Sequence, residues 1–284
     1  MNQRLGALDE VRRASDHSTA VTVVVVETLQ LDLVGVSLEV HRYASSGRLV
    51  CMLPGLGGGI RQFADLGKRL ATAGFQPVAV NPRGAGSSTG SLENLRMQDL
   101  ADDVAAVMEH LGAPAIVIGN AFGNRVARFV AFSRPDLVTA VVLVCAGGEV
   151  APEPDAATAM AEYADRSLSL TERLQAARRA FFAPGSHVDA SFIDPGSTTA
   201  AASAQVAAAL AESSGDWLAG GSAPMLVVQG ADDRIAPPEN GHRLKARWPD
   251  RVEVIDVAHA GHAVLIEQPE LVAEAICDFV SRRN

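Results

Sequence analysis

Five residues, Gly119-Asn120-Ala121-Phe122-Gly123, constrain the fold of this chain more than any other segment. The apolar residues 115–118 before them predict a short buried strand, and residues 124–132 after them predict a helix. A buried strand that turns directly into a helix is typical of a sheet covered by helices. The turn therefore predicts an α/β fold, and its central residue, Ala121, lies where such a turn displays a side chain.

Length and composition narrow the class of protein. With 284 residues, the chain fits one α/β domain, or a core domain with an insertion. No apolar run reaches the roughly 20 residues of a membrane span, and the first 18 residues lack the apolar core of a signal peptide, so we expect a cytoplasmic protein. The net charge of −9 disfavours nucleic acid or an anionic membrane as partners.

The cysteines predict neither disulfides nor a metal site. There are three of them, Cys51, Cys145 and Cys277, and each stands among apolar residues. An odd number of cysteines in apolar surroundings is typical of buried reduced thiols. No two have the spacing of metal ligands. We therefore expect no metal and no cofactor.

Strand-like and helix-like segments alternate along most of the chain, which predicts a mostly parallel, eight-stranded sheet flanked by helices. The first two strands are mixed enough in polarity to be antiparallel at a sheet edge. The predicted strands cover residues 21–28, 37–43, 49–53, 77–80, 115–118, 138–144, 225–228 and 252–257. The predicted core helices cover residues 61–73, 97–111, 124–132, 238–247 and 269–282.

The alternation stops between Glu149 and Gly221, where the sequence predicts helices over 156–165, 171–182 and 200–212 and no strand. This segment is interpreted as a helical cap, or lid, over the carboxyl edge of the sheet. The predicted domains are thus a core, residues 1–148 and 222–284, and a cap, residues 149–221. The alternative is a disordered, alanine-rich linker.

Four segments follow predicted strands, where open α/β sheets place their sites. One is the turn at Ala121. The glycine-rich residues 53–59 leave backbone N–H groups free for an oxyanion, although they also fit a flexible loop. Residues 230–237 offer Asp232 and Asp233 as an acid that could hold an imidazole, or as solvated turn residues. Residues 259–263 place His262 after a glycine, as a base or as a surface side chain.

With these segments the chain resembles the α/β-hydrolase fold superfamily, the group of lactonases, esterases and haloalkane dehalogenases. The resemblance covers residue 21 to the C-terminus, and its order of nucleophile, acid and histidine falls on Ala121, Asp233 and His262. Residues 81–88 resemble the family's Asp-x-Arg-Gly-x-Gly-x-Ser loop, with Asn81 for the aspartate. By this resemblance the N–H groups of Leu56 and Phe122 are the oxyanion donors, although the histidine that precedes the loop glycine in the family is Pro54 here.

Alanine cannot attack a carbonyl, so Ala121 has three explanations: an engineered substitution of serine, an enzyme that works without a covalent step, or a binding protein. The favoured function is hydrolysis of a small ester or lactone, with the His262 and Asp233 pair retained. The alternatives are a non-catalytic binding or interaction protein, and a cofactor-independent lyase or oxygenase that uses His262 as base. We expect a small, apolar to moderately polar substrate, and a homodimer is left open. The expected pocket residues are Gly55, Gly57, Asn120, Phe181, Phe182 and Trp217.

Overall fold

The sheet of this protein is built mostly from parallel strands. The structure, a computed structural model, describes residues 24–193, 198–212 and 215–283. Within them the strands run in the order β1-β2-β4-β3-β6-β7-β8-β9, and β5 pairs with β2. Only the pairs that involve β2 are antiparallel. The strands are β1 (Val26–Leu33), β2 (Val36–Tyr43), β3 (Arg48–Leu53), β4 (Phe75–Val80), β5 (Thr89–Gly90), β6 (Ala115–Asn120), β7 (Val138–Val144), β8 (Met225–Gly230) and β9 (Val252–Val257).

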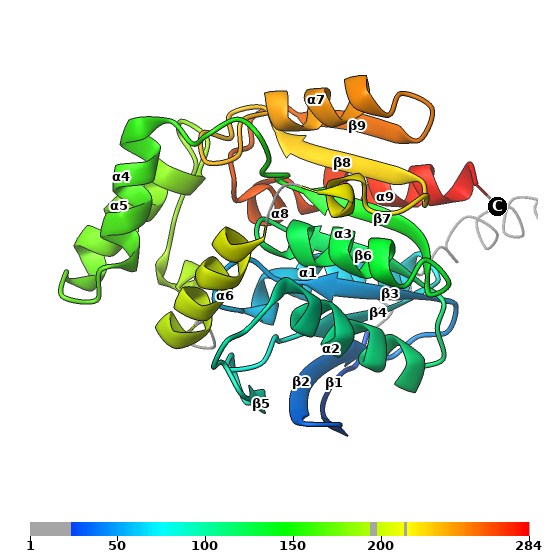
Figure 1. The fold of residues 1–284 in the computed structure, drawn as a ribbon. Coiled ribbons are helices and arrows are strands. Elements are labelled where there is room, and N and C mark those ends of the chain that lie inside the picture. The colour runs from blue at the N-terminus through cyan, green and yellow to red at the C-terminus, as the bar shows by residue number, and fades with distance from the viewer. Residues whose placement is uncertain (1–23, 194–197, 213–214, 284) are drawn as a thin grey trace, which may run out of the picture.

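Helices cover both faces of the sheet, because the central strands are apolar on both sides (Figure 1). In β3, for example, Cys51 packs into one hydrophobic cluster, while Val50 and Met52 pack into the other. The first cluster is covered by α2 (Met97–His110), α3 (Gly123–Ser133) and α7 (Glu239–Arg247). The second is covered by α1 (Ala64–Thr72), α8 (Val264–Glu267) and α9 (Pro269–Ser281).

Between β7 and β8 the chain forms a helical insertion with α4 (Pro154–Ala164), α5 (Leu170–Phe181) and α6 (Thr199–Ala211). Ser169 begins α5 with a capping box, because its hydroxyl accepts from the N–H of Glu172 and the Glu172 carboxylate accepts from the N–H of Ser169. Figure 1 shows these three helices grouped beyond the arrowhead end of β8. None of the helices in the described part of the chain has the length and apolar composition of a membrane span.

The predicted α/β-hydrolase architecture is confirmed, with the first two strands antiparallel at one edge. Most predicted elements agree with the structure to within two residues, but some differ more. The first strand covers 26–33, beyond the predicted 28, because it pairs with β2 across a tight turn at Val34 and Gly35, where Gly35 has a φ of 75°. Residues 21–23 of that prediction lie outside the described residues. The predicted helix from Arg61 begins as a 3₁₀ turn over 60–63, and β5, only two residues long, was not predicted.

The sheet order brings the loops after β3 and β6 together. From β3 the chain moves to β4 on one side, and it returns through α2 to β6 on the other side of β3. At such a switch in direction the two loops diverge and leave a crevice, which is where open α/β sheets bind ligands. A Cβ added to Gly55 would lie 3.5 Å from the Cβ of Ala121, so the two loops are in contact.

Two glycines allow this close packing. A Cβ on Gly119 would lie 2.3 Å from the carbonyl oxygen of Gly123, and a Cβ on Gly123 would lie 2.3 Å from the carbonyl oxygen of Leu53. Both distances are far below van der Waals contact, and both neighbours are backbone atoms that cannot rotate away. The turn between β6 and α3 therefore requires glycine at both positions for steric reasons.

We expect Gly119→Ala to lower the free energy of unfolding by about 3 kcal/mol, the upper range for overpacking a tight site. Gly147→Ala is the matched control, because a Cβ there has no neighbour within 4 Å, and it should change stability by less than about 0.5 kcal/mol. Urea unfolding measures both variants. Equal stabilities would contradict a steric requirement at Gly119.

Candidate active site

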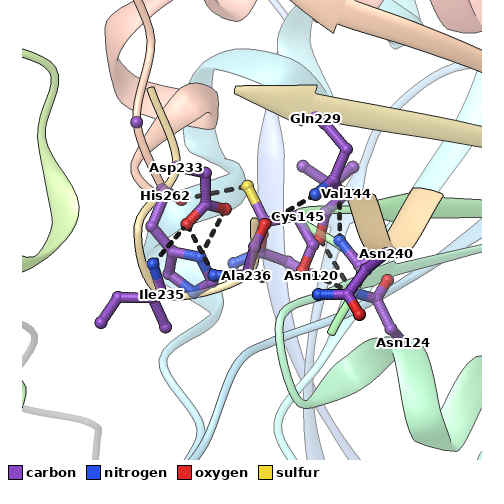
Figure 2. A network of polar contacts seen from close by, with 12 residues as sticks. Asn120, Asn124, Val144, Cys145, Gln229, Asp233, Ile235, Ala236, Asn240 and His262 are labelled. Carbon is purple, nitrogen blue, oxygen red and sulfur yellow. Dashed lines mark hydrogen bonds and ion pairs between the residues drawn. The ribbon is translucent and has the colours of Figure 1, made fainter. Parts of the chain in front are cut away.

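Asp233 and His262 form a buried hydrogen-bonded pair at the carboxyl edge of the sheet. The Nδ1 of His262 lies 2.8 Å from Oδ2 of Asp233. The Asp233 side chain is fully buried and that of His262 is 13% exposed. Oδ1 of Asp233 accepts from the N–H groups of Ile235 and Ala236, at 2.9 and 2.8 Å (Figure 2). The carboxylate is thus fixed by three hydrogen bonds, and it can hold the imidazole with a proton on Nδ1.

The neighbouring Asp232 has a different environment. Its side chain is exposed, whereas Asp233 is 3% exposed as a residue. The turn after β8 is closed by a hydrogen bond from the N–H of Asp233 to the carbonyl of Gly230. The structure therefore brings Asp233, and not Asp232, to the imidazole.

A third polar group, the thiol of Cys145, lies beside this pair, and sequence reasoning missed it (Figure 2). Its sulfur donates to the backbone carbonyl of His262 at 3.2 Å. Cys145 directly follows β7 with a φ of 54°, a strained value for a residue other than glycine. Burial, and secondly the nearby Asp233 carboxylate, raise the pKa of the Cys145 thiol well above its usual range. The one sequence signal that could have identified Cys145 was its position directly after a strand, which the other site segments share.

Within the part of the chain that the structure describes, one group of side chains has ligand atoms close enough to share a metal ion. It consists of Cys145, Asp233 and His262, whose ligand atoms all lie within 4.8 Å of one another. Their donor atoms are already engaged: Asp233 bonds His262, and the thiol bonds a carbonyl. Metal binding also needs the thiolate, which the raised pKa of Cys145 disfavours. The arrangement therefore fits a hydrogen-bonded network better than a metal centre.

Ala121 lies in the turn between β6 and α3 with a left-handed backbone, φ 49°. Its N–H donates to the carbonyl of Val144 at 3.0 Å, and Val144 directly precedes Cys145. The turn, the thiol and the imidazole therefore occupy one edge of the sheet. Outside glycine, such a backbone conformation costs on the order of 1 kcal/mol and is found mainly at functional turns. At this turn the strained residue carries only the methyl side chain of alanine.

Two backbone N–H groups lie free near this turn. The N–H groups of Leu56 and Phe122 have no hydrogen-bond acceptor within the described part of the chain. The loop that carries Leu56 is held from both sides: the N–H of Gly57 donates to Gln205 of α6 at 2.8 Å, and that of Gly59 donates to Oδ1 of Asn81 at 3.1 Å. A fixed loop with a free N–H is a suitable oxyanion donor.

Asn81 explains one departure from the family pattern. Its Oδ1 accepts from Gly59, and its Nδ2 donates to the carboxylate of Glu39 at 3.0 Å. An aspartate at position 81 has no donor for Glu39 and would place two carboxylates side by side. With Glu39 as its neighbour, the amide is the side chain that fits.

The structure distributes the predicted pocket residues between two places. Phe181 belongs to an aromatic cluster with Tyr163 and Phe192, and its ring centroid lies 5.9 Å from that of His262. Phe182 packs on Phe192 in the same cluster, with ring centroids 4.9 Å apart. Trp217, the third aromatic residue expected at the pocket or in the packing of the lid, lies elsewhere. It stacks on Phe129 of α3 at 4.9 Å inside the hydrophobic core, because the insertion returns across that face of the sheet.

The remaining predicted residues lie at the loop ends. Gly55 touches Ala121, and Gly57 binds Gln205. Asn120, the last residue of β6, donates to Gln62, while its Oδ1 has no partner among the described residues although it is buried. An amide oxygen left this way is an acceptor that a ligand can use.

Glu267 joins the histidine loop to the insertion. Its carboxylate accepts from the N–H of Gly261 at 2.7 Å and from the N–H of Ala183 at 2.9 Å. The N–H of Ala263 also donates to the carbonyl of Phe181 at 2.8 Å. Gly261 and Ala263, the residues on either side of His262, are therefore both linked by hydrogen bonds to the residues at the end of α5.

The fold is that of the α/β-hydrolase superfamily. Residues 44–269 match the model of the serine aminopeptidase family S33, and the chain belongs to this family. It is 30% identical over 198 residues to the hydrolase YugF of Bacillus subtilis, covering 64% of this chain and 71% of that one. It is 27% identical over 215 residues to 3-oxoadipate enol-lactonase 2 of Acinetobacter baylyi, covering 73% and 79%. The esterase EaEST of Exiguobacterium antarcticum superposes with a TM-score of 0.73 at 20% identity, covering 88% and 97%.

The thiols should be unreactive in the native protein. Burial raises the pKa of Cys51 to about 12 and raises the pKa values of Cys145 and Cys277, and the thiolate is the reactive form. We therefore expect native protein at pH 8 to react slowly with iodoacetamide, first at the half-buried Cys277, and urea to release all three. Mass spectrometry reads each site. Fast modification of Cys145 in native protein would contradict its burial beside Asp233.

Proposed function

We propose that this protein hydrolyses a small ester or lactone by general-base catalysis, with His262 as the base and Ala121 at the nucleophile position of the turn. The observation that carries the proposal is the Asp233–His262 pair. A fully buried carboxylate with three hydrogen bonds, one of them to an imidazole, is costly to build and has a direct use in orienting a base.

The proposed reaction runs without a covalent intermediate. His262 takes a proton from water through Nε2 as the water oxygen forms a bond to the carbonyl carbon. The carbonyl oxygen becomes an oxyanion, stabilised by the N–H groups of Leu56 and Phe122. The intermediate collapses, the bond to the alkoxide breaks, and the alkoxide takes the proton from His262. Asp233 holds Nδ1–H and stabilises the imidazolium throughout.

The relatives support an acyl substrate, because one is an enol-lactonase and a structural neighbour is an esterase. The aromatic cluster around Phe181, packed against His262, supports a substrate with an apolar part and of small size. We also propose that the helical insertion serves as the lid of this site, since it supplies both that cluster and Gln205 on the loop of Gly57.

Ala121→Ser should create a covalent site if His262 is aimed at position 121. We expect labelling by a fluorophosphonate and a rise in aryl-ester turnover of about 10²-fold or more, within the roughly 10⁶-fold that a nucleophile contributes to a complete triad. The control is the double variant Ala121→Ser with His262→Ala, which should not be labelled. If the variant is not labelled and its turnover does not rise, the proposed alignment of His262 with position 121 is contradicted.

Substrate turnover by the unmodified chain should depend on His262. We expect His262→Ala to lower ester or lactone turnover by about 10²–10⁴-fold, the usual contribution of a general base. His259→Asn is the matched control, because His259 is exposed on the same loop and Asn tolerates its φ of 56°. Stopped assays across a panel of lactones and aryl esters measure both. Equal turnover in the two variants would contradict the role of His262 as base, and ligand binding without turnover would favour a binding protein.

A further inference from the structure

Gln205 is the only polar residue that α6 buries. All other residues of this helix are alanine, valine or leucine, except Thr199 and Ser203, which are exposed. Gln205 itself is 1% exposed. A buried amide is costly unless it is hydrogen-bonded, so its partner indicates what the side chain does. Its Oε1 accepts from the N–H of Gly57, in the loop after β3, at 2.8 Å.

The start of the same helix holds the other backbone group of Gly57. Thr198 is the N-cap of α6, and its N–H donates to the carbonyl of Gly57 at 3.0 Å. The hydroxyl of Thr198 also donates to the carbonyl of Gly84 at 2.8 Å, so this end of α6 is tied to two loops of the core. The helical insertion therefore holds Gly57 at both its N–H and its carbonyl.

The loop after β3 needs such support because it is rich in glycine. Gly57, Gly58 and Gly59 have φ values of 83°, 96° and 102°, in a region that glycine enters freely and other residues avoid. A run of glycines has many alternative conformations, and ordering it costs more entropy than ordering other residues. Hydrogen bonds to neighbouring elements therefore have to define the shape of this loop.

Such bonds fix the peptide planes on both sides of Leu56. A peptide unit is planar, and in the trans form its N–H and its carbonyl point in opposite directions. The unit before Leu56 is held through the carbonyl of Gly55, which accepts from the N–H of Gly58 at 3.2 Å. The unit after Leu56 is held through the N–H of Gly57 by Gln205. The direction of the Leu56 N–H is therefore set by this turn, and α6 holds the turn from outside.

The same bonds leave one donor of the loop without an acceptor. Among residues 56–59, the N–H groups of the three glycines all donate to acceptors in the protein. The N–H of Leu56 has no acceptor within the described part of the chain. A single free donor in an otherwise satisfied loop is suited to one oxygen of a ligand.

We propose that Gln205 and Thr198 are positioning residues, through which α6 holds the loop after β3 in the shape that presents the Leu56 N–H to an oxyanion. The role at the oxyanion rests on the proposed function, whereas the holding of the loop can be measured without any reaction. The helical insertion is then part of the catalytic apparatus, because undocking of α6 would release the oxyanion donor as well as uncover the site.

Hydrogen exchange of single backbone amides, followed by NMR, tests the positioning. In the unmodified chain the N–H of Gly57 should be protected at least about tenfold more than that of Leu56. Gln205→Met should remove most of this difference, because it keeps the length of the side chain and replaces the amide oxygen by a methyl group. Methionine fits there, since Gln205 lines an apolar cavity with Pro54 and Phe122. Unchanged protection of Gly57 in this variant would overturn the inference.

Further variants make the result specific to the amide oxygen. Gln205→Glu returns an acceptor at the same distance and should rescue most of the protection that Gln205→Met loses. Ser203→Met places the same new side chain on the exposed face of α6 and should leave the exchange of Gly57 unchanged. If Gln205→Met does not fold, Gln205→Ala replaces it, because alanine is the best helix former and α6 is already rich in it.

Turnover of 4-nitrophenyl acetate links the positioning to the reaction. Gln205→Met should lower kcat by about tenfold, less than the roughly 10²–10³-fold cost of losing a whole oxyanion donor. KM should change by less than about twofold, because the donor acts in the transition state. Faster exchange of Gly57 with an unchanged kcat would overturn the role at the oxyanion. If the unmodified chain turns over no ester or lactone while the exchange still depends on Gln205, the proposed function fails and the positioning is supported.

Discussion

The close approach of backbone at Gly119 and Gly123 is the constraint on which the rest of the site depends. It lets α3 start against the end of β3, with no side chain between them. As a result Ala121 takes a left-handed conformation at the crevice, and the N–H of Phe122 stays free next to the loop of Leu56. Had either glycine carried a side chain, α3 would be displaced, and the loops after β3 and β6 would no longer meet.

Two buried charged residues, Asp233 and Arg128, have opposite kinds of surroundings. The carboxylate of Asp233 is saturated, because two backbone N–H groups and the imidazole of His262 supply its hydrogen bonds. The guanidinium of Arg128 is not, because its acceptors are two carbonyls and its third nitrogen has none among the described residues. In a low dielectric the first arrangement pairs the charge with an imidazole, whereas the second surrounds a buried cation with neutral groups, two carbonyls and the ring of Trp217.

The sequence predicted the fold well because its apolar strands and glycine turns are local signals. The segment 115–118, for example, is apolar at every position, and its flanking turn follows within two residues. It also placed Asp233 and His262, whose positions after strands are readable along the chain. Trp217 and Cys145 could not be placed in this way, because their neighbours, Phe129 and His262, are distant in sequence, and only the packed structure brings them together.

The ties between the histidine loop and α5 have a consequence for how this architecture varies. The carbonyl of Phe181 holds Ala263, and Glu267 holds both Ala183 and Gly261, so the end of α5 shares its hydrogen bonds with the loop of the base. The insertion is therefore not a separable module. An insertion transplanted from another member of the family would keep the imidazole in position only if it retained these backbone positions. The end of α5 is therefore the part of the insertion that a functional chimaera has to preserve.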